Sequence, residues 1–175
     1  MILKLKRTPG LYLVGFMGCG KSVVGAHLAD RLGWGFCDID DDIVRWQGVS
    51  IAEIFDTRGE EEFRRIETEA IRRRVKLIQA GRPLVVALGG GAFVRPENYE
   101  LVENNGVTVW LDCPLSIIRR RLTGTNDRPL ARDPHKFELL YYTRRDSYAR
   151  ADYRIEISGD DPELAVDSIL KLPIF

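Results

Sequence analysis

The sequence has few cysteines, no long apolar run and no excess of either charge. Its three cysteines, Cys19, Cys37 and Cys113, are too few and too widely spaced for a disulfide scaffold or a zinc cluster, so we expect a reducing cytoplasm. The uncharged apolar stretches 11–20 and 84–94 are shorter than the roughly 20 residues that span a bilayer. Lys+Arg and Asp+Glu each total 26, which leaves no net positive charge to attract nucleic acid. We therefore expect neither a membrane nor a nucleic acid as a partner.

Five β-rich runs alternate with helical patterns along the 175 residues, of which 45% are hydrophobic. This alternation predicts an α/β fold with a parallel sheet. Because the runs are almost continuously apolar, we expect helices on both faces of the sheet, and hence a three-layer α/β/α sandwich. The length fits one domain over residues 1–175, and a monomer is the simplest expectation. The predicted strands are Leu11–Gly15, Gly35–Asp38, Leu84–Leu88, Val107–Asp112 and Tyr153–Ile157.

Several residue patterns mark where helices begin and end. A first helix is predicted over Lys21–Arg31, a second begins at the capping-box pattern Ser50–Glu53, and a long one covers Glu60–Ala80. Residues 123–134 are polar, contain glycine and proline and show no period, so we expect a mobile loop there. Proline is common in first helical turns, and three prolines indicate further helix starts: Pro96, Pro114 and Pro162.

The strongest motif is a glycine-rich segment between the first predicted strand and the first predicted helix. Residues 15–22 read GFMGCGKS, which matches G-x-x-x-x-G-K-[ST] in the context that this motif requires. Glycines let backbone N–H groups face an anion, the lysine reaches the β and γ phosphates, and the serine hydroxyl ligates Mg²⁺. Cys19 is interpreted as a small spacer rather than an activated thiol. The predicted nucleotide-binding residues are Gly18, Cys19, Gly20, Lys21, Ser22 and Val23.

A phosphate loop does not identify the phosphoryl acceptor, so other polar residues must do so. If Asp38-Ile39-Asp40 continues the second strand, alternation places both carboxylates on one side, at the strand end where ligands bind. We expect one carboxylate to hold Mg²⁺ through water and the other to orient a substrate hydroxyl or accept its proton. Asp41 and Asp42 are expected to cap the helix that follows.

Arginines and glycines supply the other candidate positions. Of the adjacent Arg64 and Arg65, only one can face a cleft. A glycine triplet follows the third predicted strand, where a ligand can approach the backbone closely. An arginine on a closing loop can neutralise charge on a transferring phosphoryl group. The remaining candidates are Gly89, Gly90 and Gly91 in the triplet, Arg128 in the loop, and Arg144 and Arg145 on the helix after it.

Together these segments resemble the shikimate kinases, a family of small P-loop kinases with the nucleoside-monophosphate-kinase-like fold. The resemblance covers nearly the whole chain, through GFMGCGKS, FCDID, IFxxxGExxFRxxE, the glycine triplet, RPL and RxxxY. It implies transfer of the γ-phosphoryl group of ATP to the 3-hydroxyl of shikimate, with Mg²⁺ at the phosphates and residues 123–134 as a lid. Shikimate carries a carboxylate and three hydroxyls, which suit an arginine fork together with an acceptor carboxylate.

The resemblance also implies roles for individual residues. Asp40 resembles the residue that binds and polarises the acceptor hydroxyl, and Arg64 and Arg144 resemble the pair that holds the shikimate carboxylate. Arg120 or Arg121 resembles the residue that lies against adenine. The implied catalytic set is Lys21, Asp40 and Arg128, with Ser22 and Asp38 at the metal and Arg128 also on the ATP phosphates. The implied substrate pocket adds Gly89, Gly90, Gly91, Phe55, Phe63 and Glu67.

Some alternatives stay open. The segment Arg144–Tyr148 departs from the usual family pattern RxPLY, so Arg144 is preferred to Arg145 only for its distance from Tyr148. Ala131 replaces a leucine that is commoner in the lid. Asp112 ends a strand as in a Walker B motif and competes with Asp38 for the metal, and we favour Asp38. Rival functions are a kinase acting on gluconate or a nucleoside monophosphate, a nucleotide-binding regulatory module, and a nucleic-acid-stimulated ATPase.

Overall fold

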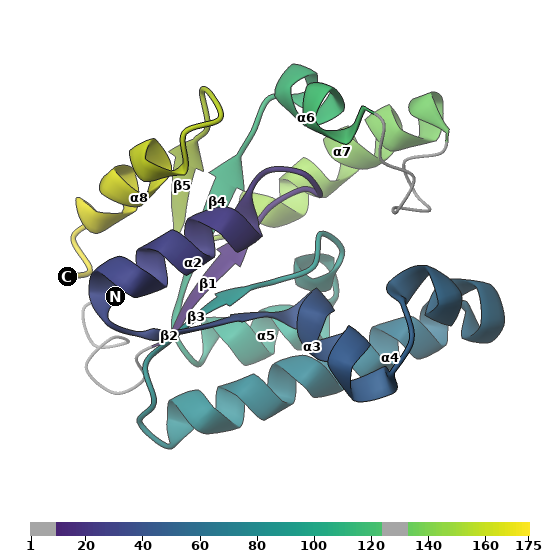
Figure 1. The fold of residues 1–175 in the computed structure, drawn as a ribbon, viewed down its shortest axis with the longest axis horizontal. Helices are drawn as coiled ribbons and strands as arrows, with labels where there is room; N and C mark the ends of the chain where they lie inside the picture. Colours follow the sequence, from purple (N-terminus) through teal and green to yellow (C-terminus); the bar gives the residue numbers. More distant parts are fainter. Residues whose placement is uncertain (1–9, 124–132) are drawn as a thin grey trace.

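A five-stranded, all-parallel sheet forms the centre of the computed structural model, which describes residues 10–123 and 133–175 (Figure 1). The strand order is β2-β3-β1-β4-β5, so β1 lies between β3 and β4. Every residue of β1, β3 and β4 is buried, which explains why these runs are apolar throughout rather than alternating. The strands are β1 (Gly10–Val14), β2 (Gly35–Asp38), β3 (Leu84–Ala87), β4 (Val107–Asp112) and β5 (Tyr153–Glu156).

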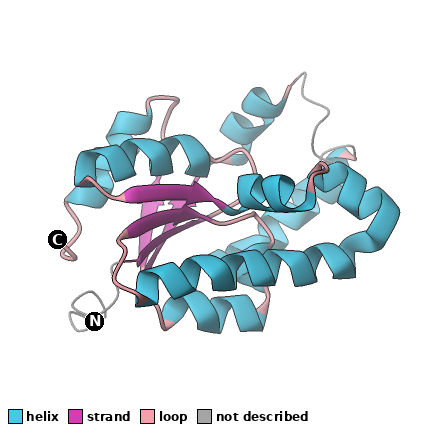
Figure 2. Cartoon of the chain, turned by 60° about the horizontal axis from the view of Figure 1, so that its bottom comes forward, coloured by secondary structure: helices cyan, strands magenta, loops and turns pink. Residues whose placement is uncertain are grey.

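Helices cover both faces of this sheet, as Figure 2 shows. Helix α2 (Lys21–Leu32) packs beside α8 (Pro162–Leu170) on one face, and α4 (Ile51–Gln79) packs beside α5 (Pro96–Glu103) on the other. The three-layer sandwich and its five parallel strands are therefore confirmed. The remaining helices are α3 (Ile39–Gln47), the 3-10 helix η1 (Ala92–Val94), α6 (Leu115–Leu122) and α7 (Pro134–Tyr148).

Most predicted boundaries agree with the structure to within a residue or two. Helix α2 ends at Leu32 and is capped by Gly33, whose φ of 66° suits glycine. Pro96 and Pro162 occupy the first turns of α5 and α8, whereas Pro114 directly precedes α6. The helices predicted from Ser50 and from Glu60 are two parts of α4, separated by a kink at Gly59, where φ is 85°. Within the described residues, no helix is both long and apolar enough to cross a membrane.

The strand end predicted at Asp38 is confirmed, but the strand alternation applied through Asp40 is wrong. Strand β2 ends at Asp38, and Ile39 is already the first residue of α3. The side chain of Asp38 is the cap, because its Oδ1 accepts hydrogen bonds from the backbone N–H of Asp40 at 2.8 Å and of Asp41 at 3.3 Å. Strand alternation therefore does not apply to Asp40. Asp41 and Asp42 lie in the acidic first turn of α3, at the helix start as expected, but the capping side chain is that of Asp38.

Candidate active site

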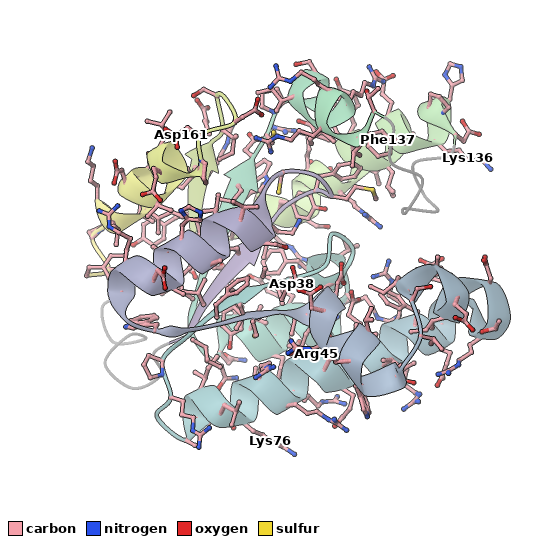
Figure 3. All side chains as sticks on the ribbon, viewed as in Figure 1. Asp38, Arg45, Lys76, Lys136, Phe137 and Asp161 are labelled. Carbon is pink, nitrogen blue, oxygen red and sulfur yellow. The ribbon has the colours of Figure 1, made fainter. Side chains whose placement is uncertain are left out.

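A cavity of about 460 Å³ lies at the carboxyl ends of β1, β2 and β3. Loops that leave parallel strands meet at this edge of the sheet, which makes it the usual ligand site of such folds. Figure 3 shows Asp38 at this edge, where β2 passes into α3. The wall contains residues 18–24 of the phosphate loop and α2, 88–90 after β3, 121–122 of α6, 157 and 159–162 before and at the start of α8, and Asp38, Asp40, Asp41 and Ala165.

The phosphate loop joins β1 to α2 and leaves the first turn of that helix without a side-chain cap. Gly15, Gly18 and Gly20 have φ values of 146°, 79° and 97°, which side chains other than glycine rarely adopt. The Nζ of Lys21 donates to the carbonyl oxygens of Gly15 at 2.7 Å and Phe16 at 2.9 Å. Uncapped N–H groups at a helix start form an anion site. Their place beside the cavity fits the phosphates of a nucleotide.

Ser22 and Asp38 meet at the edge of this loop. The Ser22 hydroxyl donates to Asp38 Oδ2, while the other carboxylate oxygen caps α3. Within the described part of the chain, no cluster of three or more His, Cys, Asp or Glu side chains could hold a metal ion. A hydroxyl and one carboxylate, however, match the few protein ligands that Mg²⁺ takes when phosphates and water supply the rest. The residues at this corner therefore fit Mg²⁺.

Cys19 lies inside the loop rather than on its surface. Its side chain is 1% exposed, and its Sγ lies 3.6 Å from the Nζ of Lys21. A Cβ at Gly15 would approach that sulfur to 2.9 Å, so the loop accommodates the thiol only because residue 15 is glycine. This packing agrees with the role of a small spacer.

The glycine triplet after β3 leaves room for charged side chains. A Cβ at Gly89 would lie 2.8 Å from Glu67 Oε2 and 3.0 Å from Asp40 Oδ1. At Gly91 it would lie 2.7 Å from the guanidinium carbon of Arg64, and at Gly90 it would lie 3.3 Å from Arg144 Nη1. None of the three glycines has a positive φ. A side chain at Gly89 or Gly91 would therefore displace a buried charged group, and one at Gly90 would be tightly packed, although the backbone conformation itself is ordinary.

Arg64, Glu67 and Arg144 form a buried charged cluster beside these glycines. The three residues are 7%, 1% and 7% exposed, and Arg64 Nη1 donates to Glu67 Oε1 at 2.8 Å. Burial raises the pKa of Glu67, and the Arg64 guanidinium opposes that rise. Burial also lowers the pKa of Arg144. Arg64 also pairs with the exposed carboxylate of Glu60 at 3.6 Å, whereas no ion pair among the described residues includes Arg144. An anionic ligand would therefore give the buried guanidinium of Arg144 a counter-charge.

The structure distinguishes the adjacent arginines that the sequence leaves open. Arg65 is exposed and bound to Glu62, whereas Arg64 is buried beside Gly91. Arg145 donates both of its terminal nitrogens to Asp112, at 2.6 and 3.1 Å, whereas Arg144 lies beside Gly90. Arg64 and Arg144 are therefore the members of each pair that reach the triplet, as the sequence analysis expects.

Of Arg120 and Arg121, which the sequence leaves open for the nucleotide base, Arg121 is the one that faces the cavity. Arg120 is not among the lining residues, and its side chain, 62% exposed, pairs with Asp160. Arg121 lines the cavity and donates to the carbonyl oxygens of Gly18 at 3.0 Å and Gly159 at 2.9 Å. Neighbouring residues of a helix point about 100° apart, so only one of the two can face the phosphate loop.

Two aromatic side chains expected in the substrate pocket lie beside the charged cluster. The rings of Phe55 and Phe63 are 4.6 Å apart, and the Arg64 guanidinium lies 5.2 Å from the Phe63 ring. Tyr148 is a residue that the sequence analysis uses only as a landmark. Its hydroxyl donates to the carbonyl of Gly90 at 2.5 Å and it also contacts Arg144. Its position four residues after Arg144 could have predicted this contact, because residues four apart lie on the same face of a helix.

Asp112, the alternative metal ligand, is engaged elsewhere. It is 8% exposed and accepts from Arg145 and from Arg154 Nε at 2.8 Å. Asp112 is also absent from the cavity wall, whereas Asp38 is part of it. This arrangement favours Asp38 as the metal-binding carboxylate. Arg128 and the central part of the expected lid lie outside the described residues.

Comparisons with known proteins agree on one family. A family model described as shikimate kinase matches residues 17–172. The shikimate kinase of Geobacter sulfurreducens is 45% identical over 160 residues, which cover 90% of this chain and 86% of the relative. That of Synechococcus elongatus is 42% identical over 166 residues, covering 93% and 85%. The structure of the Acinetobacter baumannii shikimate kinase in complex with shikimate superposes with a TM-score of 0.88 at 33% identity, covering 98% and 96%.

Proposed function

The chain belongs to the shikimate kinase family, and from that premise we propose how its side chains divide the transfer of a phosphoryl group from ATP to shikimate. It is an ATP-dependent kinase whose product serves aromatic biosynthesis. The observation that carries the proposed residue roles is the buried cluster of Arg64, Glu67 and Arg144 beside the glycine triplet. Within this cluster the guanidinium of Arg144 is buried next to the phosphate loop and belongs to no ion pair of the described residues, so a carboxylate-bearing acceptor would be held there.

At the acceptor end, Arg64 and Arg144 would bind the carboxylate of shikimate, with the backbone of Gly90 beside it. Asp40 stands at the start of α3 and lines the cavity close to the space left by Gly89. From there it would accept a hydrogen bond from the 3-hydroxyl and orient the oxygen toward the γ-phosphorus. The remaining members of the pocket, Phe55, Phe63, Glu67, Gly89 and Gly91, would shape it and hold the two arginines.

At the nucleotide end, the N–H groups of residues 18–23 would bind the phosphates and Lys21 would contact the transferred group. Ser22 and Asp38 would hold Mg²⁺, which when bound neutralises charge on the phosphate oxygens. Arg121, rather than Arg120, would lie against the base, because it faces the loop and the cavity. Arg128 keeps its assignment to the ATP phosphates from the sequence motif RPL alone.

Transfer needs little covalent chemistry from the protein. The hydroxyl oxygen forms a bond to the γ-phosphorus as the bond to the β-γ bridging oxygen breaks, and the hydroxyl proton is lost. Asp40 would position that hydroxyl and take the proton, while Lys21 would stabilise charge on the transferred group. We propose that the enzyme acts as a monomer, which is the simplest expectation for a single domain of this length. The three free cysteines and the balance of 26 acidic and 26 basic residues favour a cytoplasmic enzyme without nucleic-acid partners.

Substitution of Asp40 tests these roles directly. Asp40→Asn should lower kcat with shikimate by about a hundredfold, because an amide neither accepts the proton nor carries charge. Asp30→Asn, an exposed aspartate on α2 outside the cavity, is the control and should keep normal turnover. ADP release would be measured with ATP and Mg²⁺, and with shikimate, gluconate or no acceptor. Near-normal turnover by Asp40→Asn would remove Asp40 from the proposed mechanism.

A further inference from the structure

Asp112 holds two arginines that come from different elements. Its buried carboxylate accepts from Arg145 on α7 at 2.6 and 3.1 Å and from Arg154 on β5 at 2.8 Å. Both guanidinium groups also lie over the ring of Trp110, at 4.9 and 5.1 Å from its centroid. The two arginines thus share the same carboxylate and the same ring. They differ in the element that each one fixes in place.

Arg145 fixes the helix that carries Arg144. The buried face of α7 contains Phe137, Tyr141, Arg144 and Tyr148, and Arg145 lies just outside that face. Arg145 Nη1 also donates at 3.0 Å to the Tyr141 hydroxyl, which in turn donates at 2.8 Å to the carbonyl of Cys113. A rotation of α7 about its axis would break these bonds. The connection from the end of β4 to α7 therefore fixes the direction in which Arg144 points.

The same helix face packs directly on the phosphate loop. The ring of Phe16 contacts Phe137 and Tyr141 at centroid distances of 5.2 and 5.3 Å, and the Arg144 guanidinium lies 5.8 Å from it. At the other end of this face, Tyr148 donates to Gly90. Arg144 is thus held between the loop and the glycine triplet. Among the described residues, no ion pair includes Arg144. The position of its side chain therefore depends on how α7 is rotated and packed.

We propose that the Asp112–Arg145 pair is a positioning device for the acceptor site, which holds α7 in the rotation that directs Arg144 toward the shikimate carboxylate. This inference rests on the proposed role of Arg144. It gives a function to the Walker B-like strand end: Asp112 acts on the acceptor through α7 and does not hold the metal. It also explains why two consecutive arginines are present, since one binds the ligand and the other aligns the helix.

The test compares Arg145→Met with Arg154→Met. Both variants keep an unbranched side chain over Trp110 and leave Asp112 one arginine, so the loss of a guanidinium from Asp112 and from Trp110 is common to the two. Arg145→Met should raise the KM for shikimate roughly three- to tenfold and leave the KM for ATP unchanged. Arg154→Met should change neither KM. Arg145→Lys keeps the charge but lacks the planar guanidinium, so its KM for shikimate should lie between those of Arg145→Met and the unmodified protein.

Two further variants separate the ways in which the proposal can fail. If Arg145 itself contacted shikimate, Asp112→Asn would free its side chain and would not weaken shikimate binding. If the pair positions α7, Asp112→Asn should instead raise the KM for shikimate. The double variant Asp112→Asn/Arg145→Met should then have a KM for shikimate no higher than that of Arg145→Met. An equal change in Arg145→Met and Arg154→Met, or an altered Mg²⁺ dependence in Asp112→Asn, would overturn the proposal. If Arg144→Met left the KM for shikimate unchanged, the proposed role of Arg144 in binding shikimate would be wrong. If Arg144→Met raised that KM but Arg145→Met did not, the role of Arg144 would stand and only the positioning inference would be wrong.

Discussion

The two ends of the cavity both depend on glycine, but for different physical reasons. In the phosphate loop, Gly18 and Gly20 have φ values of 79° and 97°, which favour glycine whatever the space around them. In the acceptor pocket, Gly91 has an ordinary φ of −96°, and glycine is needed because the guanidinium of Arg64 occupies the space of a side chain. One end is therefore built from local backbone conformation. The other is assembled from buried side chains of distant segments.

This difference indicates where each end is vulnerable. Backbone N–H groups bind an anion whatever side chains the loop carries, so the nucleotide end tolerates change except at its glycines, Lys21 and Ser22. The acceptor end depends on charges that are buried together, and removal of one leaves its partner without compensation. We therefore expect the strongest effects on stability at the acceptor end.

Loss of Arg64 should have the largest effect on stability. Arg64→Gln should lower the free energy of unfolding by about 3–5 kcal/mol, because Glu67, 1% exposed, would lose its ion-pair partner. Arg65→Gln is the control one residue away, where the exposed pair with Glu62 would be lost without a detectable change. Urea unfolding followed by circular dichroism would measure both. Equal stability of the two variants would show that the buried cluster does not hold this end together.

A pair of glycine substitutions should affect the two ends separately. Gly91→Ala would push its Cβ against the Arg64 guanidinium, so we expect about a tenfold rise in the KM for shikimate and little change for ATP. Gly18→Ala places a side chain at a φ of 79°, so we expect the reverse pattern, with the KM for ATP raised. Steady-state kinetics with each substrate varied would test this. Similar changes in both constants for both variants would remove the distinction between the two ends.

The same contrast explains what could be predicted from the sequence. The phosphate loop and the strand boundaries are encoded by neighbouring residues, so GFMGCGKS and the apolar runs predicted them. The acceptor pocket joins α3, α4, the segment after β3 and α7, which no local pattern connects. The sequence supplied its charged residues and glycines as separate candidates, resemblance to a family joined them into one pocket, and the structure supplied their contacts.

The wrong predictions have physical causes of the same kind. Asp38 caps a helix that starts one residue later, so the acid-rich segment could be interpreted as strand or helix, and the capping side chain was assigned to the wrong aspartates. The choice between Arg120 and Arg121, which the sequence leaves open, depends on the rotation of α6 relative to the phosphate loop. That rotation is a property of tertiary packing, as is the pairing of Arg145 with Asp112.

The smallest expected effect is a difference in pH dependence between two glutamates of α4. Burial raises the pKa of Glu67 above its ordinary value of 4.5, so the native state binds its proton more tightly than the unfolded state, and this contribution to stability falls as the pH rises above 4.5. The hydrogen bond from Arg65 lowers the pKa of Glu62, so the contribution of Glu62 to stability is present above pH 4.5 and is lost as the pH falls below that value.

Relative to the unmodified protein, Glu67→Gln should flatten the fall in unfolding free energy above pH 4.5, and Glu62→Gln should flatten the fall below it. Urea unfolding between pH 3.5 and about 6.5 spans both windows. If Glu67→Gln changed stability by the same amount at every pH, Glu67 would bind its proton no more tightly in the native state than in the unfolded state, and burial at the acceptor end would have no electrostatic effect on this carboxyl.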